Sequence, residues 1–213
     1  NAVEDSLRRL QTDYIDLYQS HADDPETPLD ETAEAYDRLM QQGKVRAIGA
    51  SNFSAGRLAE SLAVSEKRGY PRYESLQPLF NLYDRVDYEK ELQPLCREKG
   101  LGVISYFSLA SGFLTGKYRS KADVSKSARS KFVEKYINER GFRIVEALDR
   151  LAQQHNLTPT QLSLAWLISQ PTITAPIASA TNLEQLNELM QAATIELSGD
   201  VIEQLNQASA WRI

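Results

Sequence analysis

The stretch Val45-Arg46-Ala47-Ile48-Gly49-Ala50 has the short apolar pattern of a buried strand, and it lies between two predicted helices. Before it, apolar residues recur at helical spacing over residues 29–40, and Gly43 is a favourable residue for ending that helix. After it, Ser54 is a favourable N-cap for a second amphipathic helix. A strand enclosed in this way is typical of a parallel sheet built from βα units.

The same alternation of strands and helices extends along the chain. Strands are predicted at residues 14–18, 45–50, 73–77, 102–106 and 174–178. Helices are predicted around residues 4–10, 29–40, 54–68, 88–99, 132–155, 159–169, 182–193 and 199–209, with a loop over 107–131. Thr27 is a predicted N-cap ahead of Pro28, and Thr158 and Gln161 form a predicted capping box. The first four strands recur about every thirty residues, which is the length of a βαβ unit.

Two α/β architectures compete, a (β/α)8 TIM-type barrel and an open doubly wound sheet. An open sheet that binds a nucleotide usually has a glycine-rich turn after its first strand, and none is present. Gly112–Lys117 resembles a phosphate-binding loop only loosely, because its spacing is too short. A barrel needs eight strands and only five are predicted, so about three more βα units are expected upstream or on another chain. The open edges of such a piece predict self-association.

Composition narrows the class of protein. The chain has 213 residues, 42% of them hydrophobic, which fits a single domain over residues 1–213 with a sizeable core. Its net charge is −5 without a basic block, so nucleic acid is not an expected partner. No apolar run approaches the length of a membrane span, so no membrane association is expected. The lone cysteine, Cys96, is predicted to be a buried apolar residue, and a reducing, cytoplasmic setting is expected.

Polar or aromatic residues stand where each predicted strand ends. They are His21, then Ser51 and Asn52, then Gln77, then Tyr106, then Ser179. In a βα barrel the carboxyl ends of the strands meet on one face, where catalysis takes place. Each residue alone also has a purely structural explanation: an exposed histidine, a helix cap or turn, or a core tyrosine. Together they predict one ring of hydrogen-bonding groups.

Such a ring suits a nicotinamide. The carboxamide of a nicotinamide needs a hydrogen-bond donor and an acceptor, which serine, asparagine and glutamine side chains provide. The ring needs a flat partner, and Tyr106 can serve. His21 can hydrogen-bond the oxygen of a carbonyl substrate. These residue types permit a nicotinamide site without requiring one.

Four stretches resemble signatures of the aldo-keto reductase family, and they occur in the family's order. The stretches are residues 13–21, 43–53, 112–118 and 184–186. The closest resemblance is to the bacterial branch that is also similar to potassium-channel β subunits. The resemblance implies a (β/α)8 barrel, of which this chain supplies about strands 4 to 8. It further implies hydride transfer between NADPH (NADP+) and a small-molecule aldehyde or ketone, without a metal.

The resemblance also implies roles for individual residues. The family's catalytic Asp, Tyr and Lys are expected upstream of this sequence, and its catalytic His matches His21. The 213-residue piece alone is therefore expected to be inactive. Ser51, Asn52 and Gln77 would hold the carboxamide, and Tyr106 would stack on the nicotinamide. The other residues implied in cofactor binding are Ser108, Leu109, Gly112 and Lys117 along the pyrophosphate, Arg129 at the 2′-phosphate, and Ser179, Gln185 and Glu188 near the adenosine.

The chain departs from the family pattern at a few positions. Phe107-Ser108 stands where Ser-Pro is usual, and Leu189 replaces an asparagine near the adenine. No basic residue occurs from Ser179 to Glu188, so the expected preference for NADPH over NADH depends on Arg129. Two alternatives to an enzyme stay open: a regulatory module that binds NADPH without turnover, and an inactive fragment that pairs with another copy.

Overall fold

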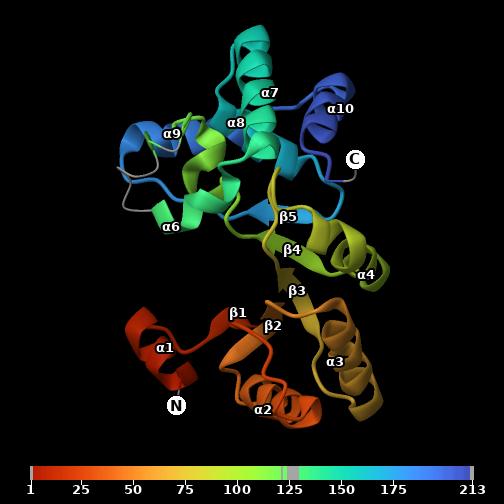
Figure 1. Cartoon of the computed structure of the whole chain (residues 1–213). Coiled ribbons are helices and arrows are strands. Elements are labelled where there is room, and N and C mark those ends of the chain that lie inside the picture. The colour runs from red at the N-terminus through yellow and green to blue at the C-terminus, as the bar shows by residue number, and fades with distance from the viewer. Residues whose placement is uncertain (1, 121, 124–129, 212–213) are drawn as a thin grey trace. The chain divides into compact units, whose positions relative to one another are not determined.

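A computed structural model describes residues 2–120, 122–123 and 130–211 (Figure 1). The chain groups into two compact units. Unit 1 comprises Asn1–Pro78 and Glu91–Val103, and unit 2 comprises Leu79–Lys90 and Ile104–Ile213. The single domain predicted for residues 1–213 stays a prediction. Among the described residues, no helix is both long and apolar enough to cross a membrane.

Unit 1 is built from parallel strands and the helices that connect them. Its strands are β1 (Ile15–Ser20), β2 (Val45–Ser51), β3 (Tyr73–Gln77) and the first half of β4 (Gly102–Ser105). Its helices are α1 (Ala2–Leu10), α2 (Leu29–Gln41), α3 (Ala55–Arg68) and α4 (Gln93–Lys99). Neighbouring strands pair in parallel in the order in which they occur along the chain. Helices α2 and α3 pack against each other (Figure 1).

A β-bulge sets which side chains of β3 face the helices. Ile48 pairs with Tyr73, whereas the next residue of β2, Gly49, pairs with Ser75. The extra residue, Glu74, is exposed. Tyr73 consequently lies on the helix-facing side, where its hydroxyl contacts Ser20 at 2.8 Å, while Ser75 lies on the opposite side. Bulges of this kind redirect side chains next to functional sites.

Unit 2 contains the second half of β4, strand β5 and the remaining helices. Strand β5 spans Ile173–Pro176, and the Ile177 amide just beyond it donates to the carbonyl of Ser105 at 2.8 Å. The helical segments are η2 (Ala110–Thr115), α6 (Ser130–Val133), η3 (Glu134–Tyr136), α7 (Glu139–His155), α8 (Pro159–Ile168), α9 (Leu183–Ala192) and α10 (Gly199–Ala208). A π-helical turn, η1 (Tyr88–Leu92), precedes α4.

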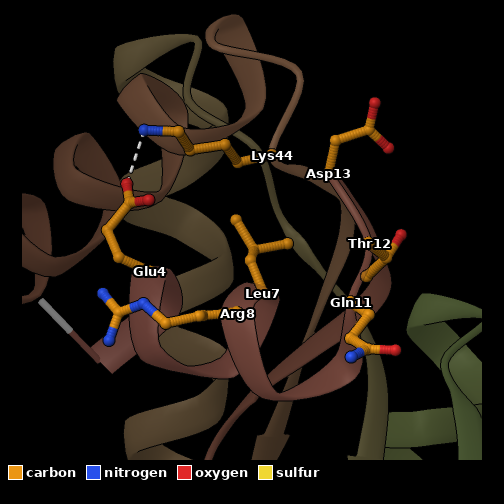
Figure 2. A pocket seen from close by; sticks show the side chains of 7 residues that line it. All are labelled: Glu4, Leu7, Arg8, Gln11, Thr12, Asp13 and Lys44. Carbon is orange, nitrogen blue, oxygen red and sulfur yellow. Dashed lines mark hydrogen bonds and ion pairs between the residues drawn. The ribbon is translucent and has the colours of Figure 1, made fainter.

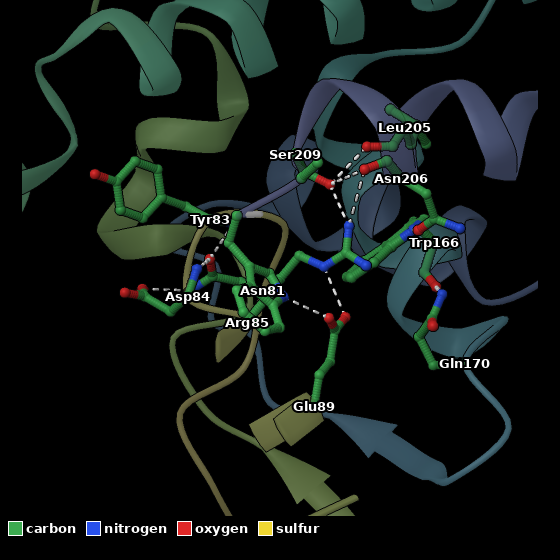
Figure 3. Close-up of polar contacts among 12 residues, drawn as sticks. Asn81, Tyr83, Asp84, Arg85, Glu89, Trp166, Gln170, Leu205, Asn206 and Ser209 are labelled. Carbon is green, nitrogen blue, oxygen red and sulfur yellow. Dashed lines mark hydrogen bonds and ion pairs between the residues drawn. The ribbon is translucent and has the colours of Figure 1, made fainter. Parts of the chain in front are cut away.

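Arg85 connects the core of unit 2 to the end of α10 (Figure 3). Its guanidinium donates to Glu89 at 2.6 Å, to the Ser209 hydroxyl at 2.6 Å and to the Asn206 carbonyl at 3.2 Å. It also lies over the ring of the fully buried Trp166. The charge of this arginine faces carbonyls near the carboxyl end of a helix, where a cation is favourable.

The strand order is β1-β2-β3-β4-β5, and the protein is therefore an α/β protein with a parallel sheet, as predicted. The predicted strand positions agree with the observed ones to within one or two residues. Five consecutive strands with helical crossovers are consistent with part of a (β/α)8 barrel. The caps at Ser54 and Thr158 and the buried position of Cys96 are also confirmed, and burial raises the pKa of the Cys96 thiol to about 11.

Three local predictions were wrong. Thr27 does not cap α2, since Pro28 holds that position and the Thr27 hydroxyl donates to Asp24 instead. The helix predicted over residues 88–99 is present: its first part is the π-helical turn η1, which continues into α4 at Gln93.

The other two errors concern residues 107–155. The predicted loop over 107–131 contains the short helix η2, and the helix predicted over 132–155 is interrupted at residues 137 and 138, between η3 and α7. A Cβ on Gly141 would lie 1.9 Å from the Tyr136 carbonyl, so glycine at this position allows the end of η3 to approach the first turn of α7. Asn138 then caps α7 by accepting from the Gly141 amide.

Candidate functional site

Four predicted site residues come together at the carboxyl ends of β1, β2 and β3 in unit 1. Ser51 and Gln77 are the last residues of β2 and β3 and pair in register. The Ser51 hydroxyl donates to the Gln77 carbonyl at 2.9 Å. The Asn52 amide donates to the Ser51 hydroxyl at 3.2 Å and to the His21 carbonyl at 2.8 Å. Asn52 thereby connects the ends of all three strands.

The conformation of Asn52 makes this arrangement possible. Its φ of 56° lies in the left-handed region, which asparagine tolerates better than most residues. Strand β2 therefore ends abruptly, and Ser54 begins α3 two residues later. The side chain of Asn52 is exposed, whereas that of Ser51 is buried.

A half-buried ion pair fixes the loop that carries His21. Arg57, in the first turn of α3, contacts both carboxylate oxygens of Asp23, at 2.8 and 3.0 Å. Such bidentate pairs hold their partners in a defined orientation. His21 is itself exposed, two residues before Asp23, so its imidazole is accessible to a ligand.

The predicted site residues of unit 2 begin directly after β4. Tyr106 forms an isolated parallel bridge with Leu79, and its ring meets that of Phe107 edge-on at 5.4 Å. Burial and the charge of Asp84 raise the pKa of the Tyr106 hydroxyl. Ser108 is buried and donates to the Ser105 carbonyl at 3.3 Å.

The segment after Tyr106 has an unusual backbone. Phe107, Ala110, Ser111 and Gly112 all have positive φ. The carbonyl of the predicted residue Leu109 accepts from the Gly112 amide at 2.8 Å. This hydrogen bond closes a tight coil of small, buried residues.

Lys117 folds back over this coil. A Cβ built on Gly112 would lie 2.9 Å from the Lys117 ammonium, and the φ of +90° at Gly112 favours glycine. The Lys117 ammonium also lies 5.0 Å from the centre of the Tyr118 ring. A cation above a backbone turn is a suitable partner for a phosphate.

The residues predicted near the adenosine lie farther along unit 2. Ser179 is exposed after β5. The side-chain oxygen of Gln185 accepts from the amide of Thr181 at 2.9 Å, at the start of α9. Glu188, on the same helix, accepts from the hydroxyl of Thr158. Arg129 lies outside the described residues, so the structure leaves its predicted role as a prediction.

Two supporting residues were missed in the sequence. Asn81 is fully buried; its amide donates to Asp84 and to the Phe107 carbonyl, both at 3.0 Å, and its oxygen accepts from the amides of Tyr83 and Asp84. It therefore fixes the peptide that follows Tyr106. Gln19 donates to the side-chain oxygen of Gln77 at 3.2 Å. A polar residue two positions before His21, on the strand face that also carries Ile15 and Leu17, was the available signal.

The hollow in Figure 2 lies elsewhere in unit 1. Residues from α1 and from the segment before β1 line it, including Leu7 and Thr12, together with Lys44, which directly precedes β2. A salt bridge of 2.5 Å between Glu4 and Lys44 crosses one side. The hollow is thus at the amino ends of the strands, whereas the site residues follow their carboxyl ends. Among the described residues, no group of three or more His, Cys, Asp or Glu side chains could hold a metal ion.

Comparison with known proteins decides the family. The model of the "Aldo/keto reductase family" matches residues 1–210. The chain belongs to the aldo/keto reductase family. The parallel sheet and its helical crossovers fit the barrel of this family, and the specific branch related to potassium-channel β subunits stays a prediction.

Relatives within the family include proteins named as oxidoreductases. The chain is 36% identical over 205 residues to "Uncharacterized oxidoreductase YrpG" of Bacillus subtilis (strain 168), covering 96% of this chain and 61% of that protein. It is 32% identical over 211 residues to "Probable aldo-keto reductase 1" of Glycine max, covering 98% and 59%. It is 31% identical over 223 residues to "Protein tas" of Escherichia coli (strain K12), covering 96% and 64%. The chain thus spans less than two thirds of each relative's length.

The described residues of this aldo/keto reductase chain fit a nicotinamide cofactor. At the ends of β2 and β3, Ser51, Asn52 and Gln77 supply both donors and acceptors, as a carboxamide requires. In unit 2, the space above Gly112 that a Cβ would fill brings a lysine ammonium onto a backbone turn. The first feature suits the amide of the cofactor and the second suits its phosphates.

Proposed function

We propose that the protein containing this chain is an NADPH-dependent aldo-keto reductase that acts on an aldehyde or ketone. The observation that carries the proposal is the set of hydrogen bonds connecting Ser51, Asn52 and Gln77 beside His21. Membership of the aldo/keto reductase family supports it. When bound, NADPH supplies the hydride, and the protein supplies binding, orientation and electrostatics.

Each predicted site residue near the nicotinamide has a defined role in the proposal. Ser51, Asn52 and Gln77 bind the carboxamide and so fix the rotation of the nicotinamide. Tyr106 covers one face of the ring and leaves the other for the substrate. His21 donates a hydrogen bond to the carbonyl oxygen and orients it. Positioning of this kind accounts for a large share of the rate enhancement in enzymes.

The remaining predicted residues bind the rest of the cofactor. Lys117 neutralises the pyrophosphate above the coil at Gly112, together with Ser108 and Leu109. Arg129 pairs with the 2′-phosphate, since a guanidinium is always charged and can bind it through two hydrogen bonds. Residues on and before α9 bind the adenosine; they are Ser179, Gln185 and Glu188.

A kinetic comparison of two histidine variants tests the proposal. Intact protein should oxidise NADPH in the presence of aldehydes, followed by the loss of NADPH absorbance. His21→Ala should lower kcat by about a hundredfold, the usual contribution of a group that handles the reacting oxygen. His155→Ala is the matched control, because His155 is exposed at the end of α7 and should leave kcat unchanged.

Two results would contradict the proposal. Intact protein that binds NADPH tightly but turns over no member of a broad aldehyde panel would indicate a binding module instead. Equal kcat values for His21→Ala and the wild type would show that His21 does not take part in the reaction.

A further inference from the structure

Gln19 is a polar residue on the inner face of the sheet. It lies in β1 two positions before His21, so the two side chains leave the strand on the same side. In the register of the sheet, Gln19 pairs with Gly49, and Gly49 pairs with Ser75. In this row of unit 1, Gly49 therefore lies between two polar side chains, Gln19 on one side and Ser75 on the other.

Gly49 is required here for space. Its φ is not positive, so no special backbone conformation calls for glycine. A Cβ at this position would lie 2.4 Å from the Ser75 hydroxyl and 3.1 Å from both Cγ and Oε1 of Gln19. The Gln19 side chain therefore crosses β2 directly over Gly49, and a larger residue there would displace the Ser75 hydroxyl and push against Gln19.

By crossing β2, Gln19 reaches Gln77 on β3. Its Nε2 donates to Gln77 Oε1 at 3.2 Å, and the backbone carbonyl of Gln77 accepts from Ser51. Both oxygens of Gln77 thus accept hydrogen bonds, one from β1 and one from β2. Since the oxygen of the Gln77 amide faces Gln19, its Nε2 points to the other side.

Gln19 keeps this orientation although it leaves a polar atom unsatisfied. Gln19 Oε1 is buried without a hydrogen-bond partner among the described residues. A buried acceptor without a partner is unfavourable, and an apolar residue of similar size would avoid that penalty. The amide at position 19 is therefore better explained by what it does to Gln77 than by stability.

We propose that Gln19 is a positioning residue for the cofactor: it turns the Gln77 amide so that Nε2 donates to the carboxamide oxygen of the nicotinamide. This inference rests on the proposed function of Gln77. It adds Gln19, which does not touch the ligand, to the residues of the proposed cofactor site. It also assigns a direction to the hydrogen bond between Gln77 and the carboxamide. The inference also gives Gly49 a role, which is to leave room for the Gln19 side chain.

The test measures dissociation constants of intact protein for three probes. The probes are NADP+, 2′,5′-ADP, which lacks the nicotinamide, and the 3-acetylpyridine analogue of NADP+, which keeps the carbonyl oxygen but lacks the amide nitrogen. Gln19→Leu should weaken NADP+ and the analogue alike, by about fivefold, the size of one net hydrogen bond. Binding of 2′,5′-ADP should not change. Gln41→Leu is the control, because it removes one amide hydrogen bond on the surface of α2.

Gln19→Glu gives the sharper result. A carboxylate accepts only, so it would take a hydrogen bond from Gln77 Nε2 and turn Gln77 Oε1 towards the ligand. NADP+ can respond by rotating its carboxamide, but the analogue has no N–H to offer. The preference for NADP+ over the analogue should rise about tenfold in Gln19→Glu and stay constant in Gln19→Leu.

The outcomes separate this inference from the proposed function. Equal weakening of NADP+ and 2′,5′-ADP in Gln19→Leu, or an unchanged preference in Gln19→Glu, would overturn the role of Gln19 while leaving a cofactor site. Failure of wild-type protein to bind any of the three probes would overturn the proposed function itself. If Gln19→Leu does not fold, Gln19→Met, which keeps the length of the side chain, replaces it with the same expectations.

Discussion

The two units hold their predicted site residues in different ways. In unit 1, the predicted residues bond to one another: Asn52 to Ser51 and His21, and Ser51 to Gln77. In unit 2, other residues hold them. Asn81 fixes the peptide after Tyr106, and the coil at Gly112 depends on backbone hydrogen bonds. A site formed by strand ends thus supports itself, whereas a site formed by loops depends on a buried polar framework.

This difference predicts that substitutions of the buried polar residues of unit 2 lower stability most. Arg85→Leu should lower the free energy of unfolding by about 3–5 kcal/mol, because it leaves Glu89 buried without its cation. The side chains of Arg85 and Glu89 are only 12% and 17% exposed. Denaturant unfolding measures the loss. Arg38→Leu is the control, since Arg38 and Glu34 are largely exposed and should contribute less than about 1 kcal/mol. Similar losses in both variants would remove the distinction.

Substitutions of Asn81 test the buried polar contacts of unit 2 that lie nearer to Tyr106. Asn81→Ala should lower the free energy of unfolding by about 2–3 kcal/mol, because several buried polar groups lose their partner at once. Asn81→Asp keeps the two bonds that its oxygen accepts but loses both donors, so the loss should be similar. Asn187→Ala, at an exposed position of α9, provides the baseline. A value near that baseline for Asn81→Ala would contradict the role given to this residue.

In unit 1, Tyr73 predicts a specific dependence on pH. Burial raises the pKa of its hydroxyl to about 12 from an ordinary value of 10, despite its hydrogen bond with Ser20. Because the folded protein holds this proton more tightly, the associated stability is complete below pH 10 and is lost as the pH rises to about 12. The wild type should therefore lose about 3 kcal/mol more than Tyr73→Phe over this range. Parallel unfolding curves for the two proteins would show that Tyr73 ionises normally.

The smallest effects are expected at the two confirmed helix caps. Ser54→Ala should cost about 1 kcal/mol, since it removes the acceptor of the Arg57 amide. Thr158→Ala should cost more, about 2 kcal/mol, because its hydroxyl also donates to Glu188. Ser54→Asp should retain most of the wild-type stability, as aspartate is an equally good cap. A larger loss at Ser54 than at Thr158 would contradict this ranking.

Much of unit 1 could be predicted from the sequence because local patterns determine it. The apolar run at residues 45–50 predicted a strand, and the polar residues directly after it were predicted to share an edge with His21 and Gln77. Parallel strands place their carboxyl ends together, so strand prediction was sufficient to bring these residues together. The helix stop at Gly43 followed from the same local rules.

The parts that could not be predicted depend on distant contacts. Asn81 and Phe107 are 26 residues apart, and no pattern in either segment indicates their hydrogen bond. The interruption before α7 brings the Tyr136 carbonyl close to Gly141, which hydrophobic periodicity does not report. Gln19 and Gln77 are 58 residues apart, and the hydrogen bond between them was not predicted.

A crystal structure of the intact protein with NADP+ is the most direct test of the carboxamide site at the ends of β2 and β3. The carboxamide should lie within hydrogen-bonding distance of Ser51, Asn52 and Gln77, with Gln77 Nε2 facing its oxygen. A nicotinamide bound elsewhere, with these three side chains still bonded only to one another, would contradict the account.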